Sequence, residues 1–289
     1  MSHRIKFIVC YYGDWPPWFD AFLLSAARNQ NIDWLFFTDC KLPLAYPKNV
    51  QFINMPLGHL YKLVQTKIIQ TDNYFSKDNR RKFEPTTPEV EIDFYKICDF
   101  RPTYGILFEE ELQGYDFWGQ CDIDQIFGDI NFYITNNMLK NYDIISSRKG
   151  KISGHFTLFK NIPKVNNLFK KIDNYNQILL SKDYHSFDEY ILSNYLLRNQ
   201  HNLNIKWDKC LLNFPQETFR QYPDKEIHPG RLSKNEGLYT WKSGKLFYNH
   251  KEIMYLHFMY WKDTLKTMNF KFSDDISTFN IKFDNIYNI

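Results

Sequence analysis

The sequence lacks the long apolar runs and the cysteine patterns that mark membrane-spanning and disulfide-rich proteins. No stretch reaches about 18 consecutive apolar residues, the length that a helix needs to cross a bilayer. The five cysteines are scattered and never spaced as CxxC, so we expect no disulfide framework, no zinc knuckle and a reducing cytoplasm. The apolar run near the N-terminus has no small-residue cleavage site, and we interpret it as a strand and not as a signal peptide.

An excess of charge of one sign is also missing. The 36 basic and 33 acidic residues give a net charge of +3, and no block of five like charges occurs. This balance argues against nucleic-acid binding and against a nuclease with a basic groove. A glycine-rich phosphate loop does not follow the first apolar run, where "YYGDWPPW" (11–18) holds one glycine and two prolines. That absence argues against a nucleotidyltransferase.

Apolar residues are plentiful, and their pattern predicts an α/β fold. They make up 44% of the chain and aromatic residues 18%, enough for a sizeable core. Near-continuous apolar runs predict buried strands, and helical spacing follows the first of them. The expected order is a strand at 5–12, a helix at 18–30, and strands at 32–39 and 50–56. Such an order favours right-handed parallel crossovers.

The rest of the chain mixes expected helices and strands. We expect helices at 60–71, 91–100 and 187–200, an exposed loop at 71–91, strands at 115–124, 142–149 and 154–160, and a hairpin at 237–258 that turns at Ser243-Gly244. No linker or repeat is visible. We therefore predict one domain over 1–263 with a C-terminal extension over 264–289.

The stretch "FWGQCDID" (117–124) ends an apolar strand with two aspartates. Side chains alternate faces along a strand, so Asp122 and Asp124 should point one way and Ile123 into the core. Two carboxylates at the carboxyl end of a strand suit Mg²⁺ or Mn²⁺, which prefers oxygen ligands and shares them with phosphates. The alternative is an ordinary acidic turn.

Three segments together resemble the GT-A fold glycosyltransferases: residues 6–39, 95–108 and 115–124. They are similar to a family of bacterial polysaccharide-biosynthesis proteins, over roughly residues 4–160. The resemblance implies a mixed, mostly parallel, Rossmann-like sheet flanked by helices. It also implies that the DxD motif holds Mn²⁺ or Mg²⁺ on the diphosphate of a nucleotide-sugar, such as a UDP-sugar. Asp122 would then lie towards the ribose, and Asp124 would be the firmer metal ligand.

A late histidine and lysine extend this resemblance. In "YLHFMYWK" (255–262), His257 ends an expected strand and Lys262 follows five residues later. Some retaining GT-A families have a late His as third metal ligand and a Lys beyond it on the diphosphate. The Gly and Pro that usually accompany that motif are missing here, and a histidine packed among aromatics is the alternative.

Asp188, in "HSFDEY" (185–190), is the candidate catalytic or sugar-binding carboxylate. Ser186 and Glu189 fit a capping box, which gives Glu189 a structural role. The helical spacing turns Asp188 towards the protein body. There it could bind hydroxyl groups or act as a general base. Its alternative role is to stabilise the helix start.

The region of "YKICDFRP" (95–102) borders the nucleotide in the resembled fold. Lys96, Asp99 and Arg101 are therefore candidates to contact base, ribose or phosphate. The alternative is a solvated helix end with ordinary salt bridges.

Five further residues are candidate ligand contacts. Tyr11 and Tyr12 could stack on the base, and Asp39 could bond base or ribose. Gly154 permits close approach of a sugar ring, and His155 could bond it. Core packing is the alternative for the tyrosines.

These residues, taken with the resemblance, predict a metal-dependent glycosyltransferase. The resemblance implies a role in the synthesis of surface polysaccharide, capsule or lipopolysaccharide. The acceptor would be a saccharide or a lipid-linked saccharide at the cytoplasmic face of the membrane. The seven tryptophans and the aromatic C-terminal stretch suit peripheral membrane contact, and suit core packing equally well. A non-catalytic saccharide-binding or scaffold protein on the same fold is the alternative. Inversion or retention of the anomeric centre stays open.

Overall fold

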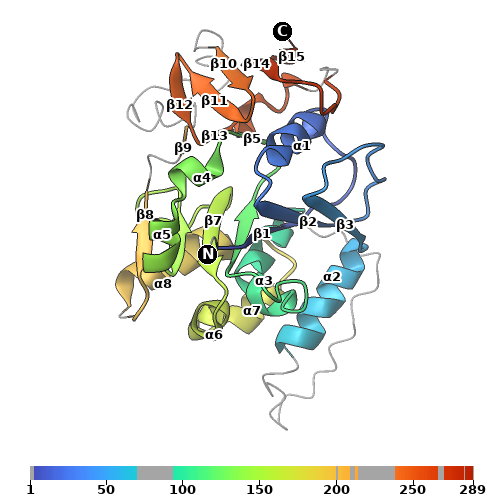
Figure 1. The fold of residues 1–289 in the computed structure, drawn as a ribbon. Coiled ribbons are helices and arrows are strands. Elements are labelled where there is room, and N and C mark those ends of the chain that lie inside the picture. The colour runs from blue at the N-terminus through green and yellow to red at the C-terminus, as the bar shows by residue number, and fades with distance from the viewer. Residues whose placement is uncertain are drawn as a thin grey trace, which may run out of the picture.

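A seven-stranded mixed sheet forms the centre of the molecule, with helices on both faces (Figure 1). The computed structural model describes residues 3–69, 94–199, 201–208, 212–213, 238–265, 270–282 and 284–288. The strand order is β3-β2-β1-β4-β7-β6-β8. The expected mixed, mostly parallel α/β architecture is confirmed, while the loop expected at 71–91 lies outside the described residues.

The central strands follow the expected apolar runs. They are β1 (Ile5–Cys10), β2 (Ile32–Thr38), β3 (Val50–Asn54), β4 (Phe117–Cys121), β6 (Ile144–Ser146), β7 (Phe156–Lys160) and β8 (Ile205–Trp207). The first four are parallel to one another, so their carboxyl ends share one edge of the sheet. Strand β7 runs antiparallel to both β4 and β6. The shared edge is where the DxD motif lies.

The helices are short, and several depart from α-helical geometry. The elements are α1 (Phe19–Ala27), α2 (Leu57–Leu63), η1 (Val64–Ile69), η2 (Phe94–Thr103), α3 (Tyr104–Leu107), α4 (Ile130–Tyr133), α5 (Asn136–Asn141), α6 (Pro163–Asn166), η3 (Leu168–Lys171), α7 (Tyr175–Leu180), η4 (Phe187–Ile191), α8 (Leu192–Arg198) and η7 (Met259–Trp261). Elements η1 and η4 are π-helical, and η2 is a 3₁₀ helix. The described parts of the helices expected at 60–71, 91–100 and 187–200 are helical, but η2 is wound more tightly than an α-helix, and η1 and η4 more loosely.

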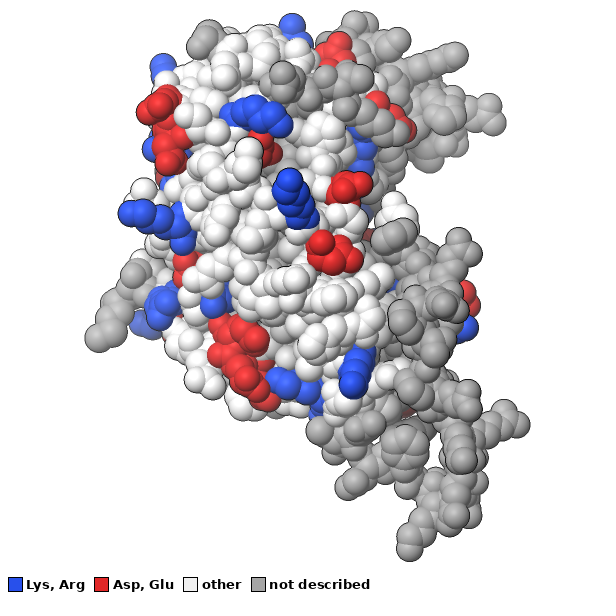
Figure 2. Space-filling view, turned by 90° about the vertical axis from the view of Figure 1, so that its right-hand side faces the viewer, with Lys and Arg blue, Asp and Glu red and all other residues white. Residues whose placement is uncertain are grey.

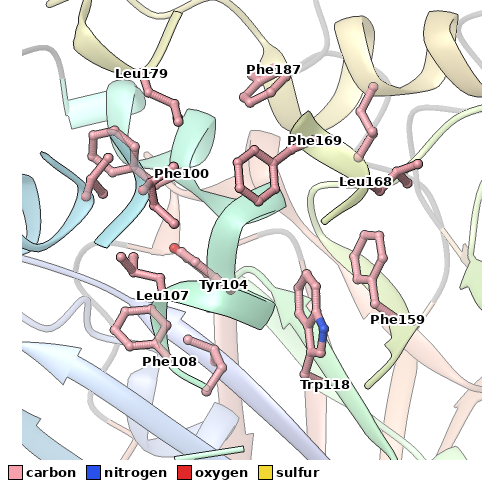
Figure 3. Packing of buried hydrophobic residues seen from close by; sticks show 14 of the residues in the cluster. Phe100, Tyr104, Leu107, Phe108, Trp118, Phe159, Leu168, Phe169, Leu179 and Phe187 are labelled. Atoms are coloured by element: carbon pink, nitrogen blue, oxygen red, sulfur yellow. The ribbon is translucent and has the colours of Figure 1, made fainter. Parts of the chain in front are cut away.

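The two faces of the sheet are covered by separate sets of helices. Along β2, Trp34 and Phe36 belong to the core under α1, whereas Leu35 and Phe37 belong to the core on the other face. Figure 3 shows this second core, which side chains of η2, α3, η3, α7 and η4 fill. Burial on both faces explains why the strands are almost continuously apolar.

A five-stranded antiparallel sheet lies at one end of the molecule (Figure 1). It contains β10 (Tyr239–Lys242), β11 (Lys245–Tyr248), β12 (Lys251–Ile253), β14 (Thr278–Lys282) and β15 (Asn285–Asn288). The hairpin turn at Ser243-Gly244 is confirmed, with φ of 48° and 89° at the two residues. Strand β14 comes from the stretch expected to be an extension, and it pairs with β10.

A small third sheet joins the two larger ones. It contains β5 (Gln125–Phe127), β13 (Tyr255–His257) and β9 (Leu212–Asn213). Five of the tryptophans are at most 6% exposed and belong to the core: Trp18, Trp34, Trp118, Trp241 and Trp261. The described helices include none that is long and apolar enough to cross a membrane. The four cysteines in the described residues are all free thiols.

Candidate active site

Asp122, Asp124 and His257 meet at the carboxyl edge of the central sheet. The two aspartates follow β4 directly, and β5 begins after them. Strand β13 runs antiparallel to β5 with His257 opposite Gln125, which brings the imidazole beside the motif. Nε2 of His257 lies 3.6 Å from Oδ2 of Asp122 and 3.4 Å from Oδ1 of Asp124. One ligand atom from each residue lies within 4.8 Å of the other two.

Lys262 completes this group from the other side of Asp124. Its Nζ lies 2.8 Å from Oδ2 of Asp124, whose side chain is 3% exposed. Burial by itself raises the pKa of Asp124, but the neighbouring His257 and Lys262 outweigh it and hold that pKa well below its usual range. The carboxylate is therefore ionised. Two carboxylates and an imidazole are a donor set that can hold a divalent metal ion.

Arg101 connects the motif to Asp188. Its guanidinium pairs with Oδ1 of Asp122 and lies 3.2 Å from Oδ2 of Asp188. It also donates a hydrogen bond to the carbonyl oxygen of Gly154 at 3.0 Å. The side chain of Arg101 is 14% exposed, so these contacts are largely screened from water. The arginine thus holds the carboxylates of Asp122, which follows β4, and of Asp188, in η4, at a fixed separation.

Asp188 is buried and only partly satisfied. The residue is 1% exposed, and its Oδ1 has no hydrogen-bond partner among the described residues. Burial raises the pKa of Asp188 to about 7, against the opposing effect of Arg101. A buried carboxyl oxygen without a partner is costly and is a candidate contact for a ligand hydroxyl.

The capping box predicted at this helix start is wrong. Ser186 has a left-handed backbone, with φ of 56°, and its side chain makes no capping hydrogen bond. Asp99 takes that part, because its two oxygens accept the backbone N–H groups of His185 and Phe187, each at 2.8 Å. A remote carboxylate therefore caps the helix that carries Asp188.

Lys96 and Asp99 form a fully buried ion pair. The two charged atoms are 3.0 Å apart, and both side chains are 0% exposed. The ammonium of Lys96 also donates to the carbonyl oxygens of Ile178 and Asp183. Neither side chain is accessible to a ligand, which corrects the expectation that they contact the nucleotide. Their place is behind the site, where they fix the segment that leads to Asp188.

Glu189 holds the segment before β7 in place, a role that was not predicted from the sequence. It accepts the backbone N–H of Gly154 at 2.9 Å and pairs with Lys151 at 2.7 Å and Arg148 at 3.7 Å. Burial by itself raises the pKa of Glu189, but Lys151 and the N–H of Gly154 outweigh it and lower that pKa. The basic stretch "SRKGK" (147–151) is the sequence signal that could have indicated this pairing.

Gly154 and His155 are packed within the protein. A Cβ atom at Gly154 would lie 2.8 Å from the Arg101 guanidinium and 3.1 Å from the Asp188 carboxylate, so only glycine fits. The ring of His155 stacks on His257 with centroids 4.4 Å apart, and its Nδ1 lies 2.9 Å from the Tyr255 hydroxyl. Burial lowers the pKa of His155 far enough to keep it neutral. Both residues support the site from behind, which corrects their expected contact with the sugar.

The residues expected to form a base pocket separate into two groups. Tyr12 is 7% exposed and packs into the core, which corrects its expected role. Tyr11 is half-buried and stacks on Trp15 with centroids 5.3 Å apart. Asp39 is exposed and accepts the N–H of Gly13 at 2.9 Å. Tyr11 and Asp39 stay candidates for base or ribose contacts.

The sequence matches a family of unknown function (DUF6625) over residues 7–289. The chain belongs to this family. No curated protein matches the chain.

Among solved structures, the similar ones include three glycosyltransferase structures. An active-site mutant of LgtC has 9% sequence identity and a TM-score of 0.43, with 87% of this chain and 86% of that chain covered. The galactosyltransferase LgtC in complex with donor and acceptor sugar analogues has 11% identity and a TM-score of 0.44, with the same coverage. The glycosyltransferase GlyE of Streptococcus pneumoniae TIGR4 has 10% identity and a TM-score of 0.39, covering 89% of this chain and 54% of that chain. These values are too low to assign an activity to the DUF6625 chain.

Proposed function

We propose that this DUF6625 protein is a metal-dependent glycosyltransferase that uses a nucleotide-sugar donor. The observation that carries the proposal is the convergence of Asp122, Asp124 and His257 at the carboxyl edge of a parallel sheet. Open α/β sheets bind ligands at that edge. The same three residues could be an ion-pair cluster, but Lys262 beside them adds the positive charge that a diphosphate requires.

Asp122, Asp124 and His257 would hold Mn²⁺ or Mg²⁺. A divalent cation there supplies positive charge to the departing nucleoside diphosphate. Lys262 is 43% exposed at its side chain, so its ammonium can also contact a phosphate oxygen. Each of these groups would stabilise the negative charge that develops on the departing diphosphate.

Asp188 and Arg101 would act on the sugars. The unpartnered Oδ1 of Asp188 can accept a hydrogen bond from a donor or acceptor hydroxyl. With its pKa near 7, the same carboxylate can take a proton from an acceptor hydroxyl as that oxygen attacks the anomeric carbon. Arg101 keeps the carboxylate in place and offsets part of its desolvation.

The substrate assignment follows the resemblance to polysaccharide-biosynthesis enzymes. The donor would be a UDP-sugar, and the acceptor a saccharide or lipid-linked saccharide. The product would belong to a bacterial surface polysaccharide, capsule or lipopolysaccharide, assembled at the cytoplasmic face of the membrane. Tyr11 and Asp39, at the ends of β1 and β2, would border the nucleoside.

The test is release of nucleoside diphosphate from a panel of UDP-, GDP- and other nucleotide-sugars, with Mn²⁺, with Mg²⁺ and with EDTA. Asp124→Asn should abolish turnover of the active donor, whereas Asp173→Asn, at an exposed aspartate, should keep it. Calorimetry with UDP and GDP covers the case in which transfer needs an acceptor. Absence of both turnover and metal-dependent nucleotide binding would favour the non-catalytic saccharide-binding alternative.

A further inference from the structure

The connection between β2 and β3 exposes apolar side chains in an unusual concentration. Its segment "KLPLAYPK", residues 41–48, is called the 41–48 loop below. Leu42 is 53% exposed, Leu44 103% and Tyr46 45%. Single exposed apolar residues are normal on protein surfaces. Three of them within five residues on one projecting loop indicate a surface that meets an apolar environment.

The exposure is fixed by the way the loop is anchored. The indole N–H of Trp15 donates to the carbonyl oxygen of Lys41 at 2.7 Å. The ring of Tyr46 packs edge-on against Phe52, with centroids 5.0 Å apart. Pro43 and Pro47 restrict the backbone between these anchors. The leucine side chains therefore project because of the fold.

Basic residues stand at both ends of the apolar segment. Lys41 and Lys48 are exposed, and neither forms an ion pair within the part of the chain that the structure describes. The preceding acidic residue, Asp39, is engaged with the N–H of Gly13 at the base of the loop. An apolar tip between two cations suits a bilayer surface that carries negative phosphate groups. A tyrosine at the border suits the headgroup level.

The loop lies on the functional edge of the molecule. It follows the carboxyl end of β2, and β1, β2 and β4 are parallel, so the loop and Asp122 leave the sheet along the same edge. Figure 2 views the molecule from the side of β2 and β3, where scattered basic and acidic side chains are separated by uncharged surface.

We propose that the 41–48 loop docks the protein on an anionic lipid bilayer. Leu42 and Leu44 enter the headgroup region, and Lys41 and Lys48 contact lipid phosphates. A protein partner would need about 800 Å² of complementary surface on each side. The projecting apolar residues here are confined to one eight-residue segment, which fits insertion into lipid better than a flat interface. This docking does not depend on the proposed transferase activity.

Co-sedimentation with vesicles tests the proposal. The wild-type protein should bind vesicles of phosphatidylglycerol and phosphatidylcholine, bind pure phosphatidylcholine more weakly, and lose affinity in high salt. Leu42→Ser/Leu44→Ser should lower affinity for the anionic vesicles at least tenfold or so, because both inserted side chains are lost. Lys41→Gln/Lys48→Gln should lower it about tenfold to thirtyfold and remove most of the salt dependence.

Matched variants control for general surface effects. Leu197→Ser, at a leucine 56% exposed on α8, and Lys140→Gln/Lys171→Gln, at two exposed lysines, should bind like the wild type. All seven substituted positions are exposed, so the variants should fold, which thermal melting checks. The proposal is overturned if the wild type does not bind anionic vesicles, or if the loop variants bind them with the affinity of the wild type. If the wild type is a dimer and Leu42→Ser/Leu44→Ser is a monomer, the loop contacts a second copy of the chain instead. Mn²⁺-dependent nucleotide binding, measured on the same variants, tests the proposed function separately.

Discussion

Asp99 accepts a hydrogen bond from the backbone N–H of Phe187 at 2.8 Å, across 88 positions of the sequence. The first N–H groups of a helix have no partner within the helix, and a nearby side chain usually supplies one. Here the carboxylate comes from η2, which packs against η4. Because Asp188 is the next residue, this contact sets where its carboxylate lies. The buried pair of Lys96 and Asp99 is thus part of the positioning of Asp188.

Removing Asp99 should be strongly destabilising. Asp99→Ala leaves the ammonium of Lys96 buried without its counter-charge, and breaking a buried pair in this way costs about 3–5 kcal/mol. Urea unfolding of the wild type and the variant measures that loss. Lys96→Met/Asp99→Leu removes both charges and should recover a large part of the stability. A loss below about 1 kcal/mol in Asp99→Ala would contradict the positioning role.

Gly154→Ala should disturb the site by steric crowding, without changing any charge. The added Cβ would lie 2.8 Å from the Arg101 guanidinium and 3.1 Å from carboxylate oxygens of Asp188 and Glu189. We expect about 1–3 kcal/mol of destabilisation from the overpacking and a lower rate of donor turnover. Gly58→Ala is the matched control, since a Cβ there meets nothing within 4 Å. Equal effects of the two substitutions would show that crowding at Gly154 is unimportant.

The strands and the metal-capable group could be predicted because their signals are local. In β2, alternate residues fill opposite cores, and this gives the continuous apolar run that marks a buried parallel strand. The DxD motif follows such a run, and the sequence alone therefore placed Asp122 and Asp124 at a strand end. His257 was found through its resemblance to a late metal ligand, and the pairing of β13 with β5 accounts for its position.

Several partners of the charged residues could not be predicted, because they lie far away in the sequence. The sequence has the Ser-x-x-Glu pattern of a capping box at Ser186. The box does not form, because the backbone at Ser186 is left-handed and Glu189 pairs with Lys151 instead. Likewise, the sequence around Lys96 and Asp99 is typical of an exposed helix end, but both side chains are buried in the folded protein. Local patterns give the type of element, whereas tertiary contacts decide which polar side chains face a ligand.

Replacing Arg101 should change metal affinity and activity in opposite directions. Arg101→Gln removes a cation from Asp122, so Mn²⁺ meets less electrostatic repulsion and should bind several-fold more tightly. The same change releases Asp188, and donor turnover should fall by about a hundredfold, as for other lost positioning contacts. Calorimetric Mn²⁺ titration and a turnover assay measure the two effects. Weaker Mn²⁺ binding in the variant would mean that Arg101 organises the metal ligands themselves.

The raised pKa of Asp188 predicts how stability depends on pH. Its pKa increases from 3.8 to about 7 on burial, so the folded protein binds a proton more tightly than the unfolded chain. The resulting stabilisation is fully present below pH 4 and is lost as the pH rises through 7. Asp188→Asn removes this titration. The stability of the variant relative to the wild type should therefore increase by about 3 kcal/mol from pH 5 to pH 8, measured by urea unfolding.

The same pKa gives a second readout, in activity. If ionised Asp188 accepts a proton or a hydroxyl hydrogen bond, kcat/KM of the wild type should fall about tenfold for each pH unit below 7. Asp188→Asn should have low activity without that inflection, whereas Asp173→Asn should keep the wild-type profile. An inflection near pH 7 that persists in Asp188→Asn would assign the titration to another group. Because stability and kcat/KM are measured independently, agreement of their two midpoints would identify Asp188 as the group that titrates in both.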